Sequence, residues 1–435
     1  MQAVLALWQL EPLARESLFA APAFVRLREI CQKLYCDKDC SNQGLKFPLQ
    51  NALLSLGLPA ILTPSAAHLA LSPGAAAVQL DAAFRQRESR RLHLCPLDCA
   101  DARHFPVLKF GPASVQMKSA ADLEACVDVQ RLKRFNPNWI FDAERFSQFS
   151  WLVVEEVIPL NTDPDTRAGF NFSFNANQDF REIRPHLERF PTAVEAALFA
   201  LLLLPWDRWA RFPDFNSFSI PWVYTINDDI FRWPSEPPSP DTLSWEPDFL
   251  IDRDGKEVES ERPVRFPIKE RVSEAHTSLN DTVWSDLMRV RKSPLFESPI
   301  AHFLVRGFVS DGVDEFLAHV MVIEAALGLE IDYDGKRRNK LPVKKQGATF
   351  RLATRLSALL GSKRAGEDFD KLFDLRSAFV HGRSMSPITG EDRLLARRLA
   401  RRTVEALVKA ALETPAPSSR ETYLSSLLAK AWISN

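Results

Sequence analysis

The chain has 435 residues, of which 46% are hydrophobic and 26% are charged, and its formal net charge at pH 7 is −1. This length exceeds one ordinary hydrophobic core, so we expect two or three domains, and the composition is typical of a globular protein. The near-zero net charge excludes a positive field over the whole protein that would attract nucleic acid, so any nucleic-acid binding requires a local patch.

The N-terminal residues predict no targeting segment. They lack a basic region, and Glu11 interrupts their apolar run, unlike a secretory signal. The longest apolar stretch, Ala196–Leu204, is far shorter than the roughly 20 residues of a membrane-spanning helix. We therefore expect a cytoplasmic protein without a membrane partner.

Five of the six cysteines lie in two groups. The first group comprises Cys31, Cys36 and Cys40, and the second comprises Cys95 and Cys99 beside His93. A structural zinc ion takes four such ligands, usually as two closely spaced pairs, and the spacings here are looser than in those pairs. We therefore favour reduced thiols that are partly buried on helices, with structural zinc as the alternative. No metal and no other cofactor is predicted.

Residues 1–104 are predicted to form a helical N-terminal region. Apolar residues recur at three- and four-residue spacing in Leu5–Phe19 and Phe24–Leu34, as they do on one face of a helix. Ser72–Gly74 indicates a turn. A cationic stretch precedes the second cysteine group and comprises Arg85, Arg87, Arg90 and Arg91. We interpret it as a solvated helix face, with a binding site as the alternative.

Residues 105–290 show a mixed α/β pattern and are expected to act as a sensor or regulatory domain. Strands are predicted at Ser150–Leu160, Gly169–Phe174 and Phe218–Ile226, a helix at Ala193–Leu204 and a hairpin turn at Asp252–Gly255. The first 290 residues contain no Gly-rich phosphate loop, no nucleophile elbow and no His-Glu-x-x-His helix. Chemistry in this part of the chain, for example at the cysteine groups, is therefore the least favoured hypothesis.

After Pro294 the chain is strongly helical. Helices are predicted at Ile300–Val309, Val313–Leu327, Thr349–Leu360, Asp368–Val380 and Asp392–Leu412. Gly361 and Gly382 favour helix ends, and Pro415 stops the last of the five helices. The short connections favour an antiparallel bundle over residues 294–415, followed by a C-terminal helix in 416–435. The predicted fold class is α+β, with an all-α bundle after a mixed α/β region.

Two charged residues interrupt the apolar stripes of their own helices. Arg376 lies on the stripe that Phe369, Phe373 and Val380 define, and Glu324 lies on the stripe of the helix predicted at 313–327. An unpaired charge at such a position is costly, so Arg376 must be paired or must face a partner. Two compatible interpretations follow: an internal Glu324–Arg376 ion pair, or an anion-binding Arg376 that this pair orients.

His381 follows Arg376 in an Arg-x-x-x-x-His pattern and precedes Gly382. A histidine at a helix C-terminus usually complements the negative end of the helix dipole. Histidine also donates or accepts a proton near neutral pH, so His381 is a candidate general acid or base. An ideal helix separates two positions at this spacing by about 140°, so the two side chains need not meet within one chain.

The segment FDLRSAFVHG (Phe373–Gly382) resembles the signature of the Apea-like HEPN family, in which an Arg and a His at this spacing precede a Gly. The upstream segment Phe316–Gly328 resembles an earlier helix of that family, with Glu324 in the acidic position. The resemblance covers only the C-terminal third, residues 294–415. It implies a helical bundle that forms a homodimer and joins two such motifs across a twofold axis.

By this resemblance the composite site would cleave RNA without a metal ion, and such ribonucleases resemble toxins and phage-defence effectors. His381 would move protons as the ribose 2′-hydroxyl attacks the adjacent phosphate. Arg376 would hold that phosphate, and a 2′,3′-cyclic phosphate would result. Ser377 departs from many active members, which carry Asn, Asp or His directly after the Arg, but a serine can still donate a hydrogen bond.

Cations near the motif predict contact with RNA phosphates. The basic ridge, as we call Arg393, Arg397 and Arg401, recurs every four residues on one helix, and Arg383 and the loop Lys336–Lys345 add further charge. A ridge that is merely solvated is the alternative. Two functions remain: a HEPN endoribonuclease regulated by its first 290 residues, or a non-catalytic dimerisation or binding module.

Overall fold

The computed structural model of the chain contains two compact units, each built from three segments. The structure describes residues 1–36, 45–161, 164–167, 189–251, 255–269, 275–333, 347–382 and 387–433. Unit 1 draws on Met1–Pro96, Met117–Ile183 and Pro221–Leu243, and unit 2 draws on Leu97–Gln116, Arg184–Ile220 and Ser244–Asn435. The two regions predicted before residue 290 therefore each supply segments to both units.

Unit 1 begins with helices that share one apolar core. They are α1 (Gln2–Trp8), α2 (Pro22–Tyr35), α3 (Lys46–Ser55) and α4 (Pro73–Arg85), with 3₁₀ turns at Arg15–Ala20, Pro59–Ile61 and Pro64–Leu69. Phe24, Leu49 and Phe231 are fully buried in this core. Ser72, predicted to lie in a turn, instead caps α4, because its hydroxyl accepts a hydrogen bond from the backbone N–H of Ala75.

Three strands of unit 1 lie in the order β4-β1-β5. They are β1 (Glu88–Leu97), β4 (Ser150–Pro159) and β5 (Tyr224–Asn227), and short helices α5 (Ala120–Cys126), α6 (Val129–Phe135), α7 (Ala143–Phe146) and α8 (Pro164–Arg167) complete the unit. β1 and β5 are antiparallel, with Arg91 opposite Asn227. The prediction of a helix face for Arg90 and Arg91 is thus wrong, because strands remote in the sequence hold this segment extended.

Unit 2 contains two antiparallel strand pairs and a buried helix before its C-terminal helices. The pairs are β2 (Leu108–Phe110) with β3 (Ala113–Met117) and β6 (Trp245–Ile251) with β7 (Glu257–Pro263), and the helices are α9 (Thr192–Leu202) and α10 (Trp206–Trp209). α9 confirms the helix predicted at Ala193–Leu204. The β6–β7 pair agrees with the predicted hairpin, although most of its turn, like the strand predicted at Gly169–Phe174, lies outside the described residues.

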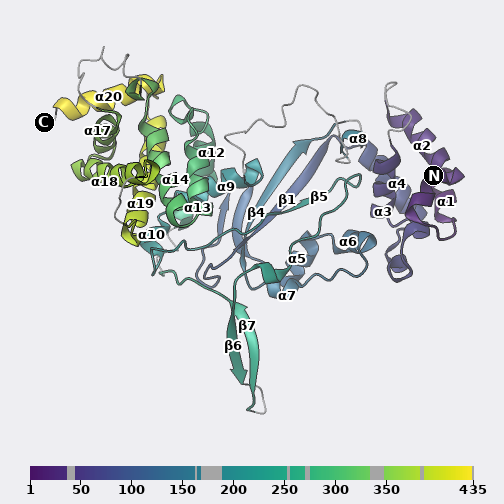
Figure 1. Ribbon diagram of the computed structural model, residues 1–435. Helices are drawn as coiled ribbons and strands as arrows, with labels where there is room; N and C mark the ends of the chain where they lie inside the picture. The colour runs from purple at the N-terminus through teal and green to yellow at the C-terminus, as the bar shows by residue number, and fades with distance from the viewer. Residues whose placement is uncertain are drawn as a thin grey trace. The chain divides into compact units, whose positions relative to one another are not determined.

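The C-terminal part of unit 2 is helical, as predicted (Figure 1). Its helices are α11 (Ala275–Ser278), α12 (Asp281–Val290), α13 (Ile300–Val309), α14 (Gly312–Leu327), α15 (Glu330–Tyr333), α17 (Ala348–Leu360), α18 (Lys363–Val380), α19 (Gly390–Ala411) and α20 (Arg420–Ile433). α14 packs against α13 and α19, while α17 packs against α18 and α20. The chain is therefore a mixed α and β protein with a helical C-terminal region.

Local signals set the ends of these helices. Thr389 and Asp392 form a capping box at the start of α19, in which each side chain accepts a hydrogen bond from the other residue's backbone N–H. Gly361 and Gly382 have φ angles of 59° and 61°, a left-handed conformation that costs glycine little, and they follow α17 and α18. Among the described helices, none is both long and apolar enough to cross a membrane.

Candidate functional site

The Arg-x-x-x-x-His motif occupies the last turns of α18. Arg376 and Ser377 are half-buried on the helix, and His381 is its exposed C-cap residue. The backbone N–H of His381 donates to the carbonyl of Ser377 over 3.1 Å, and Gly382 then turns the chain away. The helix end therefore presents the imidazole to solvent on a fixed backbone.

Glu324 of α14 faces Arg376 across the helix packing, as predicted. The distance between Arg376 Nη2 and Glu324 Oε2 is 3.8 Å, and the two side chains are 28% and 15% exposed. Burial raises the pKa of Glu324, and the charge of Arg376 opposes that shift. Arg376 also lies over the ring of Phe373, with 5.8 Å between its Cζ and the ring centroid. The guanidinium is therefore oriented from two sides.

The guanidinium of Arg376 retains free donors. Within the described residues its polar contact is the ion pair with Glu324, which is too long to be a hydrogen bond. Its remaining N–H groups can therefore donate to a phosphate. No hydrogen bond joins Arg376, Ser377 and His381 side chains to one another in the described structure, in accordance with their angular separation on the helix.

Exposed apolar side chains surround the end of α18. Phe379 and Val380 are 42% and 51% exposed, and Tyr333 of α15 is 58% exposed. The Tyr333 hydroxyl packs beside Gly328 although much of the residue is exposed, and this desolvation, with a smaller contribution from the Glu324 carboxylate, raises the pKa of Tyr333 to about 12. The sequence did not predict this exposed surface. The assignment of Val380 to the buried stripe of its helix is wrong, because its side chain is exposed at the helix end.

The cations of the basic ridge are paired within unit 2. Glu315 of α14, whose side chain is 4% exposed, accepts hydrogen bonds from Arg393 over 3.3 Å and from Arg397 over 2.9 Å. Arg401 is buried and donates to Asp207 over 3.1 Å. Much of the positive charge that the spacing indicated for RNA is thus neutralised by carboxylates distant in the sequence.

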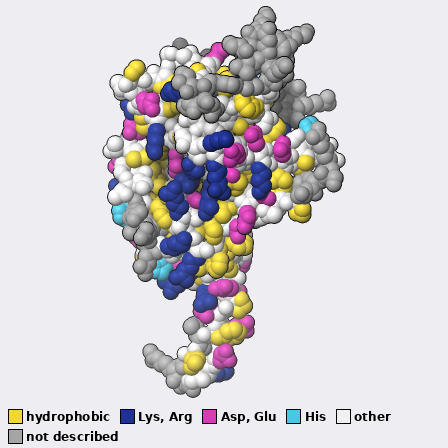
Figure 2. All heavy atoms as spheres, turned by 90° about the vertical axis from the view of Figure 1, so that its left-hand side faces the viewer, with side chains coloured by type: hydrophobic (Ala, Val, Ile, Leu, Met, Phe, Trp, Pro, Cys, Tyr) yellow, Lys and Arg dark blue, Asp and Glu magenta, His cyan; other side chains and the backbone are white. Residues whose placement is uncertain are grey.

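The surface around α19 has a mixed charge for the same reason. Arg398 pairs with Asp207 over 2.7 Å, whereas Arg402 is exposed. Figure 2 shows Lys and Arg side chains gathered on one face, with Asp and Glu side chains among them. The predicted RNA-binding residue Arg383 and the loop Lys336–Lys345 lie outside the described residues.

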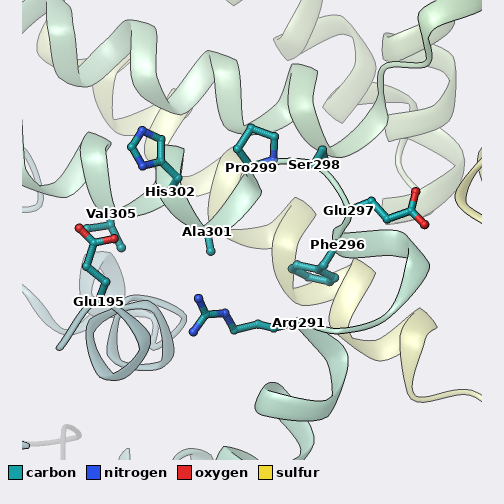
Figure 3. Close-up of a pocket in the computed structure, with 9 residues that line it drawn as sticks. All are labelled: Glu195, Arg291, Phe296, Glu297, Ser298, Pro299, Ala301, His302 and Val305. Carbon is teal, nitrogen blue, oxygen red and sulfur yellow. The ribbon is translucent and has the colours of Figure 1, made fainter. Parts of the chain in front are cut away.

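A separate hollow of about 310 Å³ lies in unit 2 and contains none of the predicted site residues. Figure 3 shows Glu195 of α9, Arg291 after α12 and His302 of α13 among its lining side chains. The carboxylate of Glu195 accepts a hydrogen bond from the backbone N–H of Arg189 over 2.9 Å. This carboxylate thus holds the start of α9, and we assign the hollow no chemistry.

The cysteines do not assemble a ligand set in the described residues. Cys31 and Cys95 are buried free thiols, and burial raises their pKa. His93 hydrogen-bonds to Thr225 over 2.9 Å rather than to a cysteine. Within the residues the structure describes, no group of three or more His, Cys, Asp or Glu is placed to hold a metal ion. Cys40 lies outside them.

One buried cluster beside the motif was missed from the sequence. Asp332 is fully buried and pairs with Arg355, whose side chain is 1% exposed, and with Arg351 over 3.5 Å. The two arginines are four residues apart and therefore share one face of α17. Two arginines at this spacing among apolar residues could have indicated a buried ion cluster, because the same pattern indicated that Arg376 must be paired.

Comparisons of the chain with models of protein families, with curated proteins and with solved structures return no match. Its function is therefore inferred from the residues of α14 and α18.

Proposed function

We propose that the chain is a metal-independent HEPN-type endoribonuclease that acts as a homodimer. One observation carries the proposal. At the end of α18 that exposes His381, the Arg376 guanidinium is oriented by Glu324 of α14 and keeps donors for a further ligand. A phosphate-binding cation and a proton-transfer group are the two components that cleavage by the ribose 2′-hydroxyl requires. The resemblance of the motif to the Apea-like HEPN family supports the same assignment.

The proposed reaction needs no external nucleophile. His381 accepts the proton of the 2′-hydroxyl as its oxygen attacks the adjacent phosphorus. The bond from phosphorus to the 5′-oxygen breaks, and the His381 of a second chain gives that oxygen a proton. Arg376 balances the charge that develops on the phosphate oxygens, and Ser377 donates a hydrogen bond there. The products are a 2′,3′-cyclic phosphate and a free 5′-hydroxyl.

The surroundings of the motif support a composite site. Phe379 and Val380 directly precede His381 and expose apolar surface to solvent. Exposed apolar side chains beside a charged motif suit an interface between two chains. We propose that this interface joins two copies of α18, so that the arginine and histidine motifs of both chains meet. Toxin or phage-defence activity is the biological role that this chemistry suits.

A non-catalytic binding module is the second candidate. The observation that favours it is the pairing of the basic ridge by Glu315 and Asp207, which leaves little free charge for RNA on α19. In that case the Glu324–Arg376 pair is structural. Arg376→Ala should then lower stability more than His381→Ala does, as the loss of the ion pair also would in a catalytic protein. The distinguishing result is that neither the wild type nor any variant cleaves RNA.

Cleavage of RNA in the presence of EDTA tests the proposal. Purified full-length chain is compared with His381→Ala, Arg376→Gln and the control His276→Ala, which alters an exposed histidine of α11. We expect losses of roughly 100-fold or more for the first two variants and full activity for the control. Thermal melting shows whether each variant is folded. Equal cleavage by the wild type and folded His381→Ala would refute the assignment.

A further inference from the structure

Unit 1 contains two adjoining hollows that the proposed ribonuclease site does not use. Their volumes are about 690 and 280 Å³, and the larger is within the range of small-molecule sites. Both are lined by Arg91 of β1, Asp128 and Arg131 at the start of α6, and Ile226 and Asn227 of β5. Because they share these walls, we treat them as one groove, called here the unit 1 groove.

The smaller hollow has an excess of positive charge. Arg91, Arg131 and Arg232 line it, and among its described lining residues Asp128 alone carries a carboxylate. Arg131 is 6% exposed and donates to one serine hydroxyl and three backbone carbonyls over 2.6 to 3.1 Å. None of these acceptors carries a charge, so no hydrogen-bonded carboxylate cancels the positive charge of Arg131, although the carboxylates of Asp128, Asp228 and Asp229 act on it from farther away. The hollow therefore favours an anion.

Arg232 supplies the donors for such an anion. It is half-buried, and in the described part of the chain its guanidinium makes no hydrogen bond and no ion pair. It acts electrostatically on the buried carboxyl of Asp229, whose pKa is raised because of burial. Among the described residues, Arg91 makes a long ion pair, 3.7 Å between its Nη1 and Glu156 Oε2, and its Nε has no hydrogen-bond partner. Two guanidinium groups with spare donors match the oxygens of a phosphate.

The larger hollow has charges of both signs and apolar surface. Arg90 and Arg134 line it together with the shared Arg91 and Arg131, and its carboxylates are Asp128, Glu155, Glu156 and Asp228. Glu155 is exposed at its rim, and within the described residues its carboxylate accepts no hydrogen bond. Asp128 uses one carboxylate oxygen to cap α6, and in the part of the chain that the structure describes the other accepts no hydrogen bond. Leu92, Val157 and Ile226 add apolar lining. This half of the groove fits a group that carries hydroxyl or amino donors on a planar or aliphatic body.

We propose that the unit 1 groove binds a nucleotide. Its phosphate lies in the smaller hollow against Arg91 and Arg232, and its sugar and base lie in the larger hollow. The phosphate balances the excess positive charge, and the sugar hydroxyls or base amino groups donate to Glu155 and Asp128. Inorganic phosphate alone would contact only the smaller hollow, and a nucleoside would contact only the larger one.

Isothermal titration of the full-length chain, without RNA, tests this assignment. The ligands are AMP, GMP, CMP, UMP, the four nucleosides and inorganic phosphate. We expect saturable one-to-one binding of at least one nucleotide, and at least tenfold weaker binding of its nucleoside and of phosphate. Arg232→Gln should weaken nucleotide binding at least tenfold, because it removes a charge-assisted contact. The control Arg85→Gln alters a largely exposed arginine of α4 outside the groove and should bind as the wild type does.

Thermal melting of both variants checks that each is folded. Arg232→Gln should change the melting temperature little, because in the described structure the guanidinium makes no hydrogen bond and acts on Asp229 only electrostatically. The absence of saturable binding for all four nucleotides would overturn the proposal. So would equal affinity in Arg232→Gln, or a nucleoside that binds as tightly as its nucleotide. Because RNA cleavage is not the readout, failure here leaves the ribonuclease proposal untouched, and the reverse also holds.

Discussion

Glu324 holds a carboxylate where burial disfavours its charge. Burial raises its pKa, and Arg376 opposes that shift from 3.8 Å away. The side chains are 15% and 28% exposed, so the pair is neither dry nor fully screened by water. An ion pair with this intermediate exposure contributes about 1 kcal/mol to the free energy of unfolding. The ionisation of Glu324 and the orientation of Arg376 therefore depend on each other.

Arg376→Gln should lower the free energy of unfolding at pH 7 by about 1 kcal/mol, because Glu324 then carries an unpaired charge. Adding Glu324→Gln should recover part of this loss. The loss should also shrink at acidic pH: the folded-state pKa of Glu324 is raised, so its charge penalty disappears once the pH falls below that value. Urea unfolding of the wild type, both single variants and the double variant measures the coupling. If the two substitutions changed the free energy of unfolding by strictly additive amounts, the coupling between Glu324 and Arg376 would be contradicted.

His319 is a histidine of α14 that must stay neutral in the folded protein. Its side chain is 4% exposed, and a Cβ at Gly307 of α13 would lie only 2.8 Å from its Nε2. Burial, with the charge of Arg397 adding to it, lowers the pKa of His319 from 6.5 to about 3. The unfolded chain therefore binds this proton between those two values and the folded protein does not. Stability should fall as the pH drops through that window.

His319→Leu should remove this part of the acid sensitivity. In the wild type the histidine contributes a slope of up to about 1.4 kcal/mol per pH unit below pH 6.5. Urea unfolding at several pH values between 7 and 4.5 should give a shallower slope for the variant. The exposed His276→Leu serves as the control and should keep the wild-type slope. Identical slopes for His319→Leu and the wild type would show that His319 does not cause the loss of stability at acidic pH.

At the scale of elements, α17 is tied to its neighbours by a buried ion cluster. Arg355 pairs with Asp332 of α15 and also donates to the carbonyls of Leu327 over 2.9 Å and Leu424 over 3.2 Å. These acceptors belong to the end of α14 and to α20. One guanidinium thus joins four helices, which fixes the support against which α18 packs.

Asp332→Asn should destabilise the protein by roughly 3–5 kcal/mol, because it removes the charge that pairs with the buried guanidinium of Arg355. The control Asp314→Asn changes an exposed carboxylate in the first turn of α14 and should cost less than about 1 kcal/mol. Chemical denaturation of the three proteins measures both effects. A loss no larger than that of the control would mean that the cluster is not a buried ion pair in solution.

The helices of the C-terminal region were predictable because their signals are local. α13 has the predicted bounds, and α17 ends at the predicted glycine. α18 begins at Lys363, earlier than predicted, because a charged first turn can remain solvated without an apolar stripe. β1 was missed because its hydrogen-bond partners come from distant parts of the chain, which periodicity within a short window cannot reveal.

At the scale of the whole molecule, contacts between distant parts of the chain also limited what could be predicted of the candidate site. The Glu324–Arg376 pair was predictable, because both residues interrupt apolar stripes on helices expected to pack together. The partners of the basic ridge were not, since Arg397 meets Glu315 82 positions away and Arg401 meets Asp207 194 positions away. Spacing on one helix shows which residues share a face, but not what that face contacts.

The proposed interface predicts a homodimer that can be broken at α18. Val380→Asp should shift the full-length chain towards the monomer, since it places a charge in an apolar contact. The control Ile140→Asp alters a side chain of unit 1 that is 84% exposed and should leave the dimer intact. Light scattering after size-exclusion chromatography measures the mass. A wild-type monomer at micromolar concentration, or an unchanged dimer in Val380→Asp, would contradict this interface.

The chemistry of the cleaved ends tests the central claim most directly. The full-length chain is incubated with RNA in EDTA, and the products are analysed by mass spectrometry. Attack by the 2′-hydroxyl, with His381 and Arg376 in their proposed roles, predicts 2′,3′-cyclic phosphate and 5′-hydroxyl ends and no cleavage of fully 2′-O-methylated RNA. Products with 3′-hydroxyl and 5′-phosphate ends, or cleavage of the methylated RNA, would contradict it.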